Sequence, residues 1–259
     1  MSKHNHKKKK HPVVEEIELE NILKEPEAKS FKLNIKQFNF TEKQKSLIKL
    51  GLDKDTKVIF ISGPSGSSKT LLAVYLALRA VSENPNVEVK YVRTIAESAE
   101  KSLGALPGSS LEKLSPFLMP LLDKLEELLP PQQIKHLIDQ DIIEGLPINH
   151  VRGASWRNKI AIFDESQSSS VKELITMITR IGENTKLYLL GDPMQSDIGN
   201  KSGFQTIYNL FNTPESVSKG IHCFEFFEED IMRSEILKYI VSVFKKLPNQ
   251  NNGNGKYQI

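Results

Sequence analysis

The sequence has one cysteine and no apolar run long enough to cross a bilayer. Cys223 has no second cysteine to pair with, which excludes an internal disulfide and suits a reducing compartment. A membrane-spanning helix needs about 18 consecutive apolar residues, and no segment approaches that length. The lysine-rich start lacks the apolar stretch of a secretory signal. We therefore expect a cytoplasmic protein with no membrane segment.

Excess charge is also scarce outside the first residues. The net charge is +3, but residues 1–11 hold five lysines and no acid, so the remaining chain sums to −2. Such a basic run attracts polyanions through counterion release, but its charge pattern favours a disordered, solvated tail without a specific partner. Trp156 is the only tryptophan, and no aromatic platform for stacking single strands is evident.

The chain of 259 residues is 39% hydrophobic, which is enough for one large α/β domain with a sizeable core. No repeat of fixed period is present. Charge and polarity predict three regions. They are a flexible charged segment at 1–30, the folded body at 31–247 and a disordered polar tail at 248–259.

Apolar strand-like runs alternate with helical runs in the body. The predicted strands are 57–62, 87–93, 159–164 and 186–192, and the predicted helices are 70–82 and 171–182. This alternation predicts a parallel sheet covered by helices on both faces, with ligands at the carboxyl ends of the strands. The segment 94–130 is helical and punctuated by prolines, and we expect it to form an insertion over one edge of the sheet.

The stretch GPSGSSKT follows the first predicted strand and precedes a helix. It is close to the phosphate-loop pattern G-x-x-x-x-G-K-[ST] in the strand–loop–helix setting that this pattern requires. Backbone N–H groups and the helix dipole can then hold phosphates. A capped turn is the plain alternative. The predicted nucleotide-binding residues are Gly63, Pro64, Ser65, Gly66, Ser67, Ser68, Lys69 and Thr70.

Ser68 occupies the place of the second glycine in that pattern. We expect Gly66 to supply the positive φ that such a loop needs. We expect Ser68 to have a negative φ and to act as a helix cap. Its side chain would then crowd the phosphates and weaken nucleotide binding.

Two further strand ends carry polar residues. The strand IAIFD ends in Asp164 and is followed by Glu165. Asp164 with Thr70 can hold Mg²⁺, and Glu165 can deprotonate an attacking water. Solvated acids before a helix capped by the box of Ser170 and Glu173 are the alternative.

The next strand, LYLLG, is followed by Asp192 and Gln195. The Gln195 amide can hydrogen-bond a γ-phosphate or the attacking water. Gly-Asp-Pro is also ordinary turn chemistry. The order of the three segments along the chain favours the site over three unrelated turns.

Together these segments resemble the PhoH-like ATPases, whose RecA-like core is related to superfamily-1 helicases. The resemblance covers roughly residues 38–244 and includes FDESQ, ITRIGENTKLYLLGDPMQSDI, YVRTIAESAEKSLGALPG and, more loosely, VRGASWRN. Departures from the family pattern are Ser68, Thr94, Ala99 and Ser166. The resemblance implies ATP binding, hydrolysis and an association with RNA.

The resemblance also implies roles for residues that the loop and strand ends do not include. Gln44 would read adenine, although Thr41 and Gln44 also form a helix capping box. Arg233 would reach a γ-phosphate, and Arg180 is a weaker candidate for the same role. The alternative for Arg233 is a surface arginine, and the alternative for Arg180 is a cation in the last turn of a helix.

The leading hypothesis is a magnesium-dependent ATPase that acts on single-stranded nucleic acid, RNA before DNA, as a helicase-like motor. About 64 residues follow Gln195, too few for a second RecA-like domain, so we expect a homo-oligomer, a hexameric ring. An ATP-dependent switch or assembly factor that binds a protein is the main alternative. A nucleotide kinase is a third hypothesis. It is disfavoured because a kinase has no use for a residue that deprotonates water.

Overall fold

The computed structural model describes residues 32–94, 110–151, 155–232 and 234–244. The strands are β1 (Val58–Ser62), β2 (Glu88–Arg93), β3 (Ile143–Pro147), β4 (Lys159–Asp164), β5 (Lys186–Gly191) and β6 (Ile221–Glu225). The principal helices are α2 (Glu42–Leu52), α3 (Lys69–Glu83), α5 (Ser110–Leu128), α6 (Pro131–Asp139), α7 (Val171–Ile178), α8 (Phe204–Phe211), α9 (Pro214–Ser218) and α10 (Glu235–Phe244).

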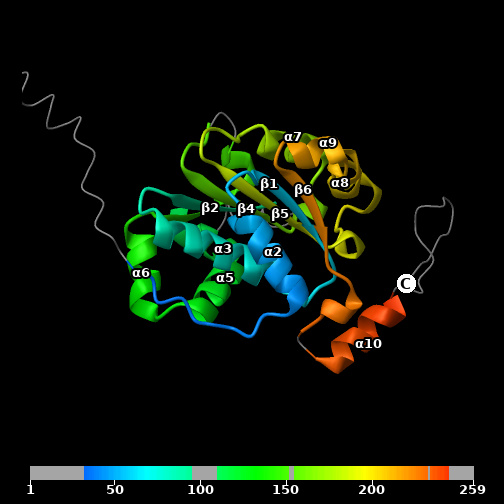
Figure 1. Cartoon of the computed structure of the whole chain (residues 1–259), viewed down its shortest axis with the longest axis horizontal. Coiled ribbons are helices and arrows are strands. Elements are labelled where there is room, and N and C mark those ends of the chain that lie inside the picture. The colour runs from blue at the N-terminus through cyan, green and yellow to red at the C-terminus, as the bar shows by residue number, and fades with distance from the viewer. Residues whose placement is uncertain (1–31, 95–109, 152–154, 233, 245–259) are drawn as a thin grey trace, which may run out of the picture. The chain divides into compact units, whose positions relative to one another are not determined.

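The strands form one parallel sheet in the order β3-β2-β4-β5-β1-β6 (Figure 1). Strand β5 therefore lies between β1, which leads into the phosphate loop, and β4, which ends in Asp164. All carboxyl ends meet at one edge of a parallel sheet, which is where ligands bind in such folds. The sheet order brings the three predicted site segments together.

Alternate side chains of the buried strands face two separate apolar layers. Ile59 and Ile61 pack with α2, α3 and α5 on one face, whereas Phe60 packs with α7 and α8 on the other. Figure 1 shows these two sets of helices on opposite sides of the sheet. The predicted α/β fold, a RecA-like parallel sheet with helices on both faces, is confirmed.

Several predicted elements need correction. Strands β3 and β6 were not predicted, and they form the two edges of the sheet. The helix at 171–182 ends earlier, at Ile178. In the segment 94–130, α5 packs against α3 and the edge strand β3, as expected of an insertion over one edge of the sheet, and its Leu125 is buried in the core.

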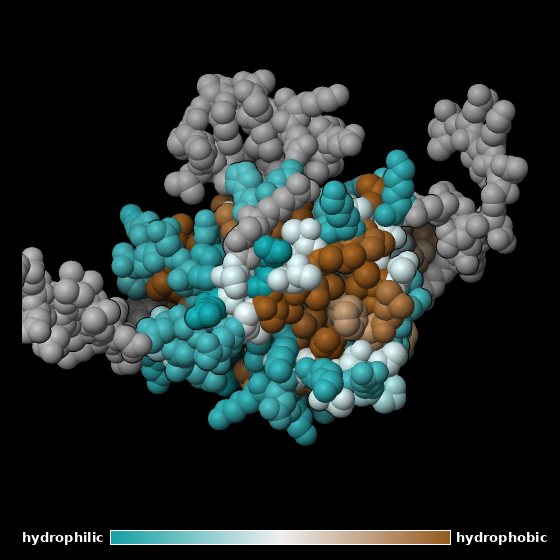
Figure 2. Space-filling view, turned by 90° about the horizontal axis from the view of Figure 1, so that it is seen from above, coloured by the Kyte–Doolittle hydropathy of each residue, from teal (hydrophilic) through white to brown (hydrophobic). Residues whose placement is uncertain are grey.

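Trp156 has a structural place in this fold. Its side chain is buried, its backbone N–H donates to the backbone carbonyl of Arg180, and its own backbone carbonyl accepts from the Thr185 hydroxyl at 3.0 Å. Figure 2 shows the face over α7 to α9, where apolar side chains gather at the surface. Its most exposed apolar residues are Val171, Ile175, Leu210 and Val217. Within the described residues, no helix has the length and apolar character to cross a membrane.

Candidate functional site

The loop between β1 and α3 has the backbone of an anion-binding turn. Gly66 adopts φ 85°, as predicted, which a residue with a Cβ rarely adopts. Gly63 lies so close to β6 that a Cβ there would be 2.7 Å from the Cβ of Phe226. The Ser65 N–H donates to a carboxylate oxygen of Asp192 at 2.9 Å, which ties the loop to the end of β5.

The prediction for Ser68 is wrong. Ser68 adopts φ 66° and ψ 19°, in the left-handed region, and its side chain makes no capping hydrogen bond to α3. Its conformation follows from the loop path, which must turn at this point before α3 can start. Glycine is the residue that adopts such a conformation without steric cost, which explains the glycine in the phosphate-loop pattern.

Lys69 begins α3 and points back over the loop. Its ammonium donates to the carbonyl oxygens of Gly63 at 2.6 Å and Pro64 at 2.9 Å. Burial lowers the pKa of Lys69, and the nearby carboxylates, Asp192 first, oppose that shift. A partly buried cation whose ammonium is bonded to carbonyl oxygens is well placed to exchange them for phosphate oxygens.

Thr70 and Asp164 meet across the loop. The Thr70 hydroxyl donates to the two carboxylate oxygens of Asp164 at 3.3 and 3.4 Å. Asp164 is buried and also accepts a hydrogen bond from the Tyr91 hydroxyl at 2.5 Å. Burial raises the pKa of Asp164, and the bond from Tyr91 counteracts this. A hydroxyl and a carboxylate are oxygen donors of the kind that Mg²⁺ prefers, so these residues fit the ion.

Glu165 follows Asp164 with a left-handed backbone, φ 54°. Its side chain is half-exposed in the cleft, which suits a group that must meet water. The Gln167 amide donates to the Glu165 carboxylate at 2.5 Å, while the Gln167 side-chain oxygen accepts from the N–H of Asp192 at 3.0 Å. Gln167 is buried and so fixes Glu165 relative to the end of β5.

Four contacts of the site residues were not predicted from the sequence: Tyr91, Arg93, Gln167 and Asp192. Arg93 lies 3.6 Å from the Glu165 carboxylate and lines the same cleft. The available signal was position: Tyr91 and Arg93 lie at the end of a predicted strand, and Gln167 lies two residues after Glu165. Which residues they contact depends on the strand order, which the sequence does not display.

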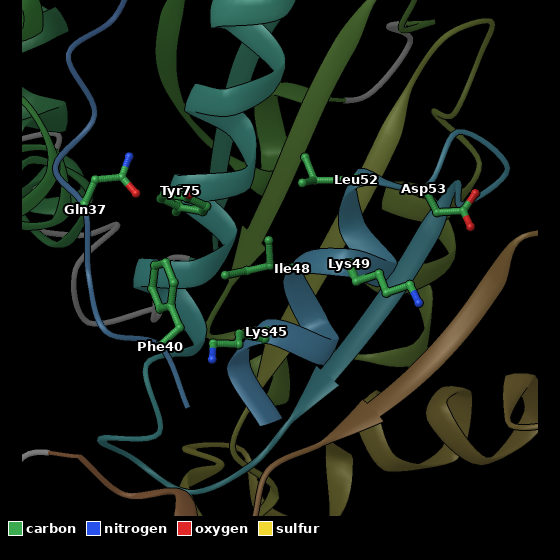
Figure 3. A pocket seen from close by; sticks show the side chains of 8 residues that line it. All are labelled: Gln37, Phe40, Lys45, Ile48, Lys49, Leu52, Asp53 and Tyr75. Carbon is green, nitrogen blue, oxygen red and sulfur yellow. The ribbon is translucent and has the colours of Figure 1, made fainter. Parts of the chain in front are cut away.

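One cleft of about 380 Å³ at the carboxyl edge of the sheet is lined by Ser68, Lys69, Thr70, Arg93, Asp164, Glu165, Gln167 and Asp192. Gln195 lies at its rim and is exposed. Met232, past β6, also lines the cleft, and its N–H donates to the Gly66 carbonyl at 3.1 Å. A larger, more open hollow between α2 and α3 (Figure 3) contains none of the predicted site residues. The chemistry therefore belongs to the smaller cleft.

Gln44 and Arg180 are not among the residues that line this cleft. Gln44 is buried in a capping box with Thr41, in which the side chain of each accepts from the backbone N–H of the other. The Arg180 guanidinium donates to the Thr176 carbonyl at the end of α7, which matches its structural alternative. Arg233 lies outside the described residues.

The arrangement is that of a P-loop NTPase core, and comparisons with known proteins agree. The chain is 34% identical over 194 residues to a PhoH-like protein of Synechocystis sp., 31% over 195 to one of Bacillus subtilis and 28% over 204 to one of Mycobacterium tuberculosis. These alignments cover 74%, 74% and 78% of this chain and 58%, 60% and 56% of the relatives. The chain thus spans little more than half the length of these relatives.

A solved structure and a family match complete the comparison. The Pif1 helicase of Candida albicans aligns with 74% of this chain and 41% of its own, at 13% identity and a TM-score of 0.35. The family described as PhoH-like protein matches residues 37–245, nearly the whole described part. The chain therefore belongs to the PhoH-like protein family.

Proposed function

We propose that this protein binds ATP and hydrolyses it to ADP and phosphate with the help of Mg²⁺. One observation carries the proposal: Lys69, the pair of Thr70 and Asp164, and Glu165 converge in a single cleft around the phosphate loop. A structural turn would not require a cation, a metal-binding pair and a half-exposed carboxylate at the same place. The combination matches the recurring parts of phosphoryl transfer to water.

The residues divide the reaction between them. Lys69 and the loop N–H groups hold the β- and γ-phosphates. Mg²⁺, held by Thr70 and Asp164, would neutralise charge on the phosphates. Glu165 accepts a proton from water as the water oxygen bonds to the γ-phosphorus and the bond to the β–γ bridging oxygen breaks. Gln167 keeps Glu165 in place, and Gln195 at the rim can orient the water.

The partner of this ATPase is a further part of the proposal. We favour single-stranded nucleic acid, RNA first, and a ring of identical subunits, as the resemblance to helicase-related ATPases implies. An ATP-dependent switch that binds a protein is the second candidate. The apolar side chains exposed over α7 to α9 (Figure 2) favour it, because patches of this kind mark protein contacts.

The experiment is phosphate release from ATP, with and without single-stranded RNA or DNA, in the parent, Lys69→Ala and Glu165→Gln. We expect the parent to release phosphate without any acceptor molecule. Lys69→Ala should lose tight ATP binding in calorimetry. Glu165→Gln should still bind ATP but hydrolyse it about 10²–10⁴-fold more slowly, as when a general base is lost.

Each result has a defined meaning. ATP binding by Lys69→Ala at the parental affinity would contradict the site, and parental turnover by Glu165→Gln would require another base. Stimulation by RNA supports the motor, whereas ATPase activity indifferent to both nucleic acids supports the protein-binding switch.

A further inference from the structure

Arg93 is a cationic side chain in the cleft that the reaction described above does not use. It ends β2, whose register with β4 sets Arg93 opposite Asp164. The cleft is lined by Arg93 together with Lys69, Asp164 and Glu165. Strand pairing, not a flexible loop, therefore determines where this guanidinium lies.

The guanidinium is incompletely bonded within the described structure. Its Nη2 lies 3.6 Å from a Glu165 oxygen, within reach of an ion pair but beyond hydrogen-bond length. Its Nε is buried and has no hydrogen-bond partner among the described residues. A buried donor without an acceptor is costly and rare in folded proteins. This geometry calls for an acceptor that arrives with a ligand.

A phosphate is the acceptor that the surroundings favour. Lys69 serves the inner part of the cleft near the loop carbonyls, and the other lining cation, Lys124, pairs with Glu127 on α5. Arg93 is thus the cation facing Glu165, on the side where the attacking water must approach. A planar guanidinium donates two parallel N–H bonds to phosphate oxygens, which an ammonium group does not do.

We propose that Arg93 is an intrachain sensor of the γ-phosphate. On ATP binding its guanidinium exchanges the long contact with Glu165 for hydrogen bonds to γ-phosphate oxygens, which leaves the Glu165 carboxylate free to accept the proton of water. ADP, which lacks that phosphate, leaves Arg93 beside Glu165. This inference rests on the proposed ATPase function, and arginines supplied by the same chain act in this way in other phosphoryl-transfer proteins.

The test compares the affinities of the full chain for a non-hydrolysable ATP analogue and for ADP, by calorimetry with Mg²⁺. Arg93→Gln should weaken binding of the analogue about 10- to 100-fold, as expected for loss of a hydrogen bond from a charged group, and leave ADP affinity unchanged. Arg93→Lys keeps the charge but loses the paired geometry, so its loss should be intermediate. Arg79→Gln, an exposed arginine paired with Glu83 on α3, is the matched control and should change neither affinity.

A double variant separates direct contact from an effect through Glu165. The analogue-specific loss should persist when Arg93→Gln is made in the Glu165→Gln background, and its disappearance there would overturn the proposal. The proposal would also be overturned if Arg93→Gln bound both nucleotides with the parental affinity. The same holds if Arg93→Gln and Arg93→Lys lost as much affinity for ADP as for the ATP analogue. A parent that binds neither nucleotide would overturn the proposed function and this role together.

Discussion

Two residues of the cleft, Ser68 and Glu165, hold left-handed backbone conformations, with φ 66° and φ 54°. Such conformations cost a residue with a side chain about 1–3 kcal/mol each and persist only where the surroundings impose them. Here the imposed geometry serves the site. The left-handed conformation of Ser68 turns the phosphate loop into the start of α3, and that of Glu165 directs its side chain into the cleft. Function and local strain coincide at these positions.

The conformation of Ser68 leads to a stability prediction. Ser68→Gly should raise the free energy of unfolding by up to about 1.5 kcal/mol, because relief of the left-handed strain, about 1–2 kcal/mol, exceeds the added chain entropy of glycine in the unfolded state, about 0.4–1 kcal/mol. ATP affinity should be at least that of the parent, since a Cβ near the phosphates is removed. Urea unfolding and calorimetry measure the two quantities.

Ser68→Ala is the matched control for this change. It removes the hydroxyl but keeps the strained Cβ, and the hydroxyl makes no capping bond, so its stability should equal that of the parent. If both variants lost much ATP affinity, the Ser68 hydroxyl would itself be a phosphate ligand. Destabilisation by Ser68→Gly would show that the left-handed strain is small.

At the level of elements, the sequence predicted what depends on local pattern and missed what depends on pairing. The central strands β1, β4 and β5 were predicted because they are continuous apolar runs with buried side chains throughout. Strand β3, IEGLP, contains a charge, a glycine and a proline, which are residues that strands disfavour. Strand β6, IHCFE, is only partly buried, so its sequence is not the continuous apolar run of a central strand. Their pairing partners in the sheet make them strands.

The same limit applies to the site. Lys69 and Thr70 could be predicted because they close the phosphate-loop motif, and Asp164 and Glu165 because they lie at the end of an apolar strand. The bond from the Asp192 N–H to the Gln167 side-chain oxygen could not, because it exists only when β5 lies beside β4. The capping box of Thr41 and Gln44 is local, so the sequence could predict it as one alternative. The sequence could not decide between that box and a contact of Gln44 with adenine.

The junction between α7 and β5 depends on a glycine. A Cβ at Gly182 would lie 2.1 Å from the Trp156 carbonyl oxygen, a backbone atom that is itself bonded to Thr185. Gly182→Ala should therefore lower the free energy of unfolding by about 1–3 kcal/mol, as overpacking does. Thermal unfolding measures the change.

Gly145→Ala serves as the comparison for Gly182→Ala. Its new Cβ would meet the end of the Leu118 side chain, which can rotate away, so its cost should be smaller. Equal stabilities for Gly182→Ala and the parent would show that the backbone at Trp156 can shift without cost.

At the scale of the whole molecule, the described residues past β6 include Met232, which lines the cleft, and the helix α10. Met232 is bonded to Gly66 in the phosphate loop, and α10 follows with most of its apolar side chains exposed. The exposed set includes Ile236, Tyr239, Ile240, Val243 and Phe244. An apolar helix attached to the nucleotide cleft supports the proposal that a neighbouring subunit packs there.

The last prediction concerns a cleft shared between subunits through Arg233. One core holds the phosphates from a single side, and an arginine from a neighbour can stabilise the transition state by about 10³–10⁵ in rate. Arg233→Ala alone and Lys69→Ala alone should both be inactive, while their mixture should recover part of the parental phosphate release, because intact halves meet at some interfaces. Lys69→Ala mixed with Glu165→Gln is the control. Both changes fall on the same half of the shared cleft, so no interface regains ATPase activity.

Head-to-tail contacts of this kind close into rings, so light scattering should show an oligomer, a hexamer in our proposal. Parental activity of Arg233→Ala, or an active species with the mass of one chain, would exclude the shared cleft and leave Arg93 as the arginine that acts on the γ-phosphate.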